Sequence, residues 1–122
     1  MKETARFFRV LADEARLQIL WLLFNHKELC VCDIMAVLEI TQSKASRHLA
    51  ALRHAGIAVD RKDGLWSYYS LRPVEDELAA QHLKLLRKTL AKLPEAGRLA
   101  AKLDHWLEQE SRRELCSRGA KA

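Results

Sequence analysis

The most constraining feature of this 122-residue sequence is a change of hydrophobic period close to Gly56. Before it, apolar residues recur at helical spacing over 41–54, with Thr41 as a candidate N-cap. After it, 57–61 and 65–71 are short β-rich runs joined by Lys62-Asp63-Gly64, and Asp-Gly is typical of hairpin turns. The sequence therefore predicts a helix that leads directly into a β-hairpin.

Helical patterns flank this unit on both sides. Two of them precede Asn25, the second with Asp13 as its N-cap, and a third begins near Cys30. Two more follow Pro73 and are separated by Pro94, which cannot continue a helix. The order helix, helix, helix-turn-helix, hairpin, helix predicts a mainly helical winged helix-turn-helix fold. We expect one domain over 1–116, with 117–122 as a flexible tail.

Charge and hydropathy narrow the class of protein. The formal net charge of +5 fits a polyanionic partner, although bulk charge alone does not identify one. The longest apolar run, 19–24, is too short to cross a bilayer, and the N-terminus lacks the pattern of a secretory signal. We therefore expect a cytoplasmic protein whose three cysteines remain reduced.

The predicted helix 41–54 carries most of the residues expected to bind double-stranded DNA. Ala45 marks its buried side, the opposite side is polar or small, and no acidic residue occurs over 41–59. Amide and guanidinium groups can contact base edges in the major groove, while basic hairpin residues can meet phosphates or the minor groove. A merely solvated charged face is the alternative, but the acid-free helix beside a hairpin favours DNA binding. The candidate DNA-binding residues are Gln42, Ser43, Lys44, Ser46, Arg47, His48 and Ala50 in the helix, and Arg61 and Lys62 in the hairpin.

Cys30 and Cys32 are residues that a general DNA-binding module would not need. Two thiols two positions apart can chelate a soft ion, and a helix N-terminus favours the thiolate that binds it. On a regular helix the two side chains point about 200° apart, so joint binding requires the first turn to unwind or to begin later. Because this helix precedes the recognition helix, we expect ion binding to shift that helix and release DNA.

A third ligand would complete a three-sulfur site. Cys116 is the only other thiol in the sequence and can reach the pair from either subunit, or it is simply an exposed thiol near the chain end. Glutathione or water can take its place. The alternative for Cys30 and Cys32 themselves is a buried apolar role, which is common for free cysteine.

Three segments resemble the arsenic-repressor (ArsR/SmtB) family: Leu11-Ala12-Asp13-Glu14-Ala15-Arg16-Leu17, Glu28-Leu29-Cys30-Val31-Cys32-Asp33 and Gln42-Ser43-Lys44-Ala45-Ser46-Arg47-His48-Leu49. The resemblance covers roughly 7–71 and implies a homodimer that binds a palindromic operator and releases it when arsenite binds as the inducer. It matches Cys30 and Cys32 to the arsenic-sensing pair, whereas Met35 stands where some members carry a third cysteine. The family's dimer interface uses the terminal helices, and the unburied stripe of Leu83, Leu86 and Leu90 is consistent with that.

Signals other than arsenite or antimonite would need different sequence features. Cadmium- and lead-sensing members of the family that the chain resembles add cysteines near the N-terminus, and none precedes Cys30. The ligand spacing of zinc-sensing members is not reproduced by His82, Asp104 and His105. A repressor that senses cadmium, lead or thiol oxidation, or a DNA-binding protein without a sensory site, stays open. We expect no enzyme, because Cys-x-Cys lacks the Cys-x-x-Cys framework of thiol redox enzymes.

Overall fold

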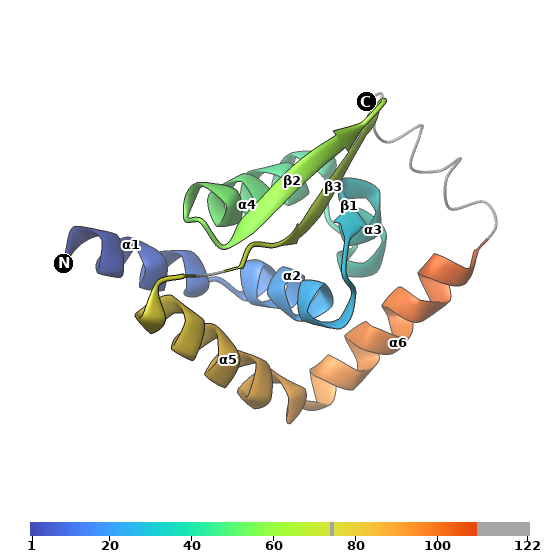
Figure 1. The fold of residues 1–122 in the computed structure, drawn as a ribbon. Coiled ribbons are helices and arrows are strands. Elements are labelled where there is room, and N and C mark those ends of the chain that lie inside the picture. The colour runs from blue at the N-terminus through green and yellow to red at the C-terminus, as the bar shows by residue number, and fades with distance from the viewer. Residues whose placement is uncertain (74, 110–122) are drawn as a thin grey trace.

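The computed structural model describes residues 1–73 and 75–109, and its helices and hairpin follow one another in the predicted order. It is mainly helical, with a small antiparallel sheet (Figure 1). None of the helices in these two ranges is long and apolar enough to span a membrane. The elements are α1 (Lys2–Leu11), α2 (Glu14–Asn25), β1 (Leu29–Cys30), α3 (Val31–Leu38), α4 (Gln42–His54), β2 (Ala58–Asp63), β3 (Trp66–Leu71), α5 (Glu77–Ala91) and α6 (Pro94–Glu108).

Side-chain caps determine where several helices begin. The Asp13 carboxylate accepts the Arg16 backbone N–H at the start of α2, and the Thr41 hydroxyl accepts the Lys44 backbone N–H at the start of α4. Pro94 occupies the first turn of α6, where its missing N–H costs no intrahelical hydrogen bond. The predicted caps of α2 and α4 are confirmed, so these two helices begin where the sequence indicated.

The sheet contains one strand more than the sequence predicted. β3 lies between β1 and β2, and both pairings are antiparallel. In the short pairing, Leu29 lies opposite Tyr69 and Cys30 lies opposite Tyr68. β1 is only two residues long, too short to show an alternating pattern, and it leads directly into α3. The extra strand therefore holds Cys30 beside the middle of β3.

The hairpin turn is shorter than predicted and lies later in the chain. Asp63 is the last residue of β2 and pairs with Trp66, so the loop consists of Gly64 and Leu65 rather than Lys62-Asp63-Gly64. Gly64 has a φ of 63°, as the first central residue of a type II′ turn requires. The turn thus uses the glycine of the Asp-Gly pair, while Asp63 stays in the ladder.

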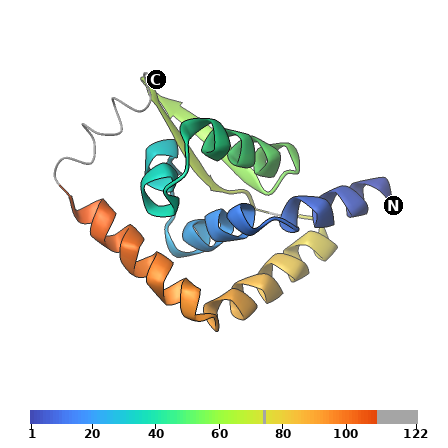
Figure 2. The same ribbon diagram turned by 180° about the vertical axis from the view of Figure 1, so that it is seen from behind.

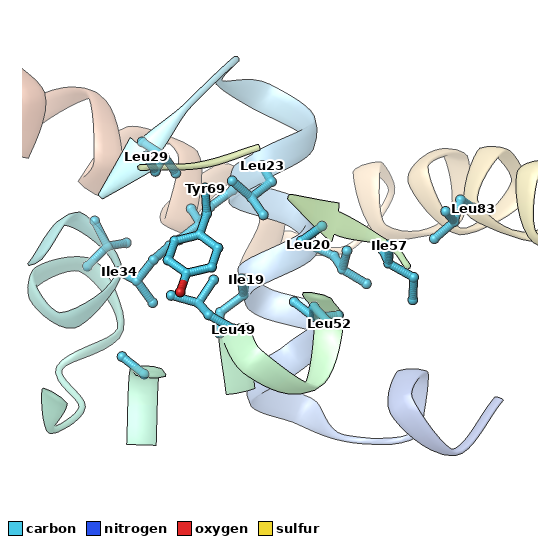
Figure 3. Close-up of a cluster of buried hydrophobic side chains, with 14 of the residues drawn as sticks. Ile19, Leu20, Leu23, Leu29, Ile34, Leu49, Leu52, Ile57, Tyr69 and Leu83 are labelled. Carbon is cyan, nitrogen blue, oxygen red and sulfur yellow. The ribbon is translucent and has the colours of Figure 1, made fainter. Parts of the chain in front are cut away.

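The core is built around α2. Ile19 and Leu20 are fully buried, and Figure 3 shows side chains from other elements around them, including Leu49 of α4, Tyr69 of β3 and Leu83 of α5. Figures 1 and 2 both show α2 between α4 with the hairpin on one side and α5 with α6 on the other. The central helix therefore supports the helix-turn-helix and the C-terminal helices together.

The C-terminal helices pack inward more than the sequence indicated. The expectation of an unburied stripe is wrong for Leu83, which is buried in the core of its own chain, and Leu86 is half-buried against the same core. The inward face of α5 covers α2, so Leu85, two positions from Leu83, points away and stays exposed. α6 is attached to α2 by the Trp21 indole, whose Nε1–H donates to the Ala96 carbonyl at 2.9 Å.

Candidate functional site

Cys30 and Cys32 lie at the start of α3 and line the same cavity. Cys30 is the N-cap residue, with extended backbone (φ −88°, ψ 166°), and Cys32 is the second residue of the helix. Because α3 begins after Cys30, the 200° separation expected within a regular helix does not apply. The cavity has a volume of about 170 Å³ and is lined by Cys30, Val31, Cys32, Met35, Gln42, Ser46, Leu65, Trp66, Ser67 and Tyr69.

Cys30 takes part in a capping box with Asp33. The Cys30 side chain accepts the backbone N–H of Asp33, and Asp33 Oδ2 accepts the backbone N–H of Cys30 at 2.9 Å. These two hydrogen bonds tie both the side chain and the backbone of Cys30 to the first turn of α3. This role of Cys30 was not predicted, although the N-cap and N3 spacing of Cys30 and Asp33 is visible in the sequence.

Asp33 also joins α3 to α6. Its side chain is fully buried, and Oδ1 accepts the indole Nε1–H of Trp106 at 2.7 Å. One carboxylate therefore holds both the backbone at the cysteine cap and a residue of the last helix. Cys116, the predicted third ligand, and the predicted tail 117–122 lie outside the described residues, and within 1–73 and 75–109 no three His, Cys, Asp or Glu side chains gather as metal ligands do.

The predicted recognition helix, α4, has a buried and an exposed side. Ala45, Leu49 and Leu52 are buried, as the helical spacing indicated. Among the candidate DNA-binding residues, Ser43, Lys44 and Arg47 are exposed and Ala50 is half-buried. Gln42 and Ser46 are half-buried and line the cysteine cavity, a placement that the sequence did not reveal.

His48 faces the start of α2 within a polar cluster. Its Nδ1 accepts a hydrogen bond from Arg16 at 3.3 Å and lies 4.0 Å from Asp13 Oδ1. Burial lowers the pKa of His48, the Asp13 carboxylate opposes this, and the Arg16 guanidinium adds to it. Arg16 Nε also donates to the Val10 carbonyl at 2.6 Å. The cluster thus connects α4 with α2 and with the end of α1.

The two basic candidates in the hairpin differ in their surroundings. Arg61 donates two hydrogen bonds of 2.7 Å to the Glu28 carboxylate, and its guanidinium lies over the Tyr68 ring at 4.7 Å. The hydrogen bonds from Arg61 lower the pKa of Glu28. Lys62 is exposed near the turn. A phosphate could reach Lys62 directly, whereas at Arg61 it would have to replace Glu28.

Comparisons with known proteins decide the family. A model described as bacterial regulatory protein, arsR family, matches residues 13–59. The arsenical resistance operon repressor of Escherichia coli is 52% identical over 68 residues, 56% of this chain and 58% of the repressor. The arsenic resistance transcriptional regulator ArsR2 of Pseudomonas putida is 43% identical over 83 residues, 68% of this chain and 70% of the regulator. The chain belongs to the ArsR family.

A solved structure agrees with this assignment. The homodimeric winged helix-turn-helix DNA-binding domain Mb0332 of Mycobacterium bovis, described as a possible ArsR-family regulator, has a TM-score of 0.61 and 29% identity. That match covers 76% of this ArsR-family chain and 82% of the domain, so the predicted fold class is confirmed. The relatives are regulators, so the expectation of no enzyme is also confirmed.

The matched regions contain the candidate site but not the whole chain. The chain spans little more than half the length of the Escherichia coli repressor. Residues 13–59 include α2, β1, α3 and α4, and therefore both cysteines and the predicted recognition helix. α5 and α6 lie outside that range. The contact between Asp33 and Trp106 thus joins a family-matched helix to a helix beyond the matched segment.

Proposed function

We propose that this ArsR-family chain is a dimeric transcriptional repressor that leaves operator DNA when arsenite binds Cys30 and Cys32. The observation that carries the proposal is the shared cavity, which the cysteines line from the α3 end and Gln42 and Ser46 line from α4. A ligand bound to the cysteines in this cavity therefore lies next to side chains of the recognition helix and can act on it directly. The names of two relatives, both regulators of arsenic resistance, support arsenite as the signal.

DNA binding is supported by the exposed side of α4. Gln42–His54 contains no acidic residue, and Lys44 and Arg47 are exposed on it. An arginine at such a position can bind guanine O6 and N7 with two hydrogen bonds, and lysine can contact phosphates. The exposed Lys62 extends this basic surface onto the hairpin.

Arsenite binding is supported by the chemistry of the cysteine pair. Trivalent arsenic is a soft centre that prefers thiolates, and each thiol that binds arsenous acid replaces one hydroxyl group with release of water. Both cysteines line the same cavity, so one ion placed there can contact both side chains. Cys116, an external thiol or a remaining hydroxyl group takes the third position. Thiols of this kind remain reduced in the cytoplasm, where we place the protein.

Coupling between ion and DNA follows from the capping box. In this proposal the Cys30 sulfur turns from the Asp33 N–H to share an ion with Cys32, which removes the acceptor of that N–H and loosens the first turn of α3. The ion then fills part of a cavity against Gln42 and Ser46 of α4. Arsenite therefore favours a conformation in which α3 and α4 are repositioned. DNA favours the conformation in which the capping box of Cys30 and Asp33 is closed.

A second copy of the chain is the partner that we propose for α1 and α5. Phe8, Leu78 and Leu85 are exposed there, and Phe8 contacts His82 edge-to-face at 5.1 Å, which joins the two helices in one surface. We expect a sedimentation mass of twice 14.0 kDa for the wild type and a shift toward monomer for Leu85→Glu. A wild-type chain that stays monomeric at every concentration would contradict the dimer.

Fluorescence anisotropy of labelled DNA from upstream of the chain's own gene tests the function. We expect tight binding by the reduced protein and release by arsenite and antimonite under a thiol-free reductant. Release by cadmium or lead alone would show that the ion is misassigned, and release by peroxide alone would show a redox sensor. A tight complex that is indifferent to every addition would reject the sensory role.

A further inference from the structure

α6 contacts α3 at both ends. Near the start of α3, the Trp106 indole donates to Asp33 Oδ1 at 2.7 Å. At the other end, Lys102 Nζ donates to Glu39 Oε2 at 2.8 Å, and Glu39 is the C-cap residue of α3 with a left-handed φ of 56°. The helix that carries the cysteine cap is therefore held against α6 by two side-chain contacts.

These two contacts differ in how much they contribute to the free energy that holds α3 against α6. Lys102 and Glu39 are both exposed, and an exposed ion pair contributes little because water and salt screen it. Asp33 is fully buried, and a hydrogen bond to a buried carboxylate is costly to lose. The hydrogen bond from the Trp106 indole is therefore the contact that can change the free energy of opening the capping box of Cys30 and Asp33.

The indole acts on the cap through the orientation of one carboxylate. Asp33 Oδ1 is oriented by Trp106, which leaves Oδ2 positioned to accept the backbone N–H of Cys30. The same residue's backbone N–H donates to the Cys30 side chain. If the Cys30 sulfur turns toward an ion shared with Cys32, the Asp33 N–H loses its acceptor, and the closed box then depends on the carboxylate that Trp106 orients.

We propose that Trp106 is a positioning residue that keeps the Cys30–Asp33 cap closed and thereby sets the arsenite affinity of the cysteine pair. The inference rests on the proposed function, because it concerns the same ion and the same release of DNA. Loss of the indole donor makes opening easier, so arsenite binds more tightly and operator DNA more weakly. A residue with only a structural role would not tighten ion binding when replaced.

The test compares Trp106→Phe with a matched control, Trp21→Phe. Each substitution removes an indole N–H that donates a hydrogen bond between α6 and another helix. Trp106 donates to Asp33 at 2.7 Å, whereas Trp21 donates to the Ala96 carbonyl at 2.9 Å. Isothermal titration calorimetry with arsenite, under a thiol-free reductant, should give about tenfold tighter binding for Trp106→Phe. For Trp21→Phe the arsenite affinity should stay within about twofold of wild type, with any loss confined to thermal stability.

A second measurement on the wild-type chain does not depend on a variant that folds. In a ¹⁵N-labelled protein, the indole resonance of Trp106, assigned through bonds, should shift when arsenite is added and its proton should exchange faster with water. The indole proton of Trp21 should keep its exchange rate and serves as the internal reference.

The outcomes separate the inference from the function on which it rests. If wild type binds arsenite and releases DNA, but Trp106→Phe does not bind it more tightly and the Trp106 indole does not respond, the inference is wrong and the function stands. If wild type does not bind arsenite, both are wrong. Tighter binding in Trp106→Phe alone, together with the indole response, supports the positioning role.

Discussion

Replacing both Cys30 and Cys32 by serine should abolish the release of DNA by arsenite. A serine hydroxyl is a poor ligand for a soft ion, so arsenite affinity should fall about 1,000-fold or more. Operator affinity should stay within about threefold of wild type, because serine is a preferred N-cap and can keep the box with Asp33. Anisotropy and calorimetry on the same samples measure both quantities.

Single thiol variants provide the controls for this result. Cys30→Ser and Cys32→Ser each leave one thiol of the pair, so each should lose most of the response, since one sulfur cannot chelate. Cys116→Ser keeps the pair and should still release DNA, with a shift in the arsenite midpoint that measures any contribution from Cys116. If the double variant released operator DNA at the same arsenite concentration as wild type, the assignment of Cys30 and Cys32 as the arsenite site would be contradicted.

Arg47→Ala should weaken operator binding strongly while leaving arsenite binding unchanged. Arg47 is exposed on the side of α4 away from Ala45 and lies outside the cysteine cavity. A bidentate contact with guanine contributes about 1–3 kcal/mol, so the two half-sites of a dimer together lose about 2–6 kcal/mol. Anisotropy at fixed salt should also show weaker discrimination between the operator and a sequence altered at one guanine.

Arg98→Ala is the matched control for the loss of charge. Arg98 is an exposed arginine on α6, so its removal changes the net charge equally without touching α4. We expect its operator affinity to stay within about twofold of wild type. Equal effects of the two substitutions would mean that α4 is not the element that reads the operator.

The helices were predictable because their boundaries are encoded locally. Asp13 and Thr41 are caps three residues before the N–H groups that they accept, and such short spacings are visible in a sequence. β1 was not predictable, since two residues carry no period and their partner, β3, comes much later in the chain. The turn lies later than predicted because Lys62 and Asp63 pair with Ser67 and Trp66, and this pairing of the two strands is not visible in the local sequence.

The site was predictable in its chemistry but not in its contacts. The sequence identified Cys30 and Cys32, yet the contact between Asp33 and Trp106 joins positions 73 residues apart and leaves no local pattern. It also could not indicate that Ser46 lines the cysteine cavity, because that depends on how α3 packs against α4. The contact of Arg61 with Glu28 was not predictable for the same reason, because Glu28 precedes β1 and is distant from Arg61 in the sequence.

Reciprocal coupling between arsenite binding and DNA binding can be measured directly. Arsenite affinity is determined by calorimetry for the free dimer and for the dimer saturated with operator, and operator affinity is determined with and without saturating arsenite. Linkage requires the two ratios to be equal, and we expect each to be about tenfold or more. Equal arsenite affinities for the free and the DNA-bound protein would contradict the account, even if arsenite binds tightly to the cysteine pair.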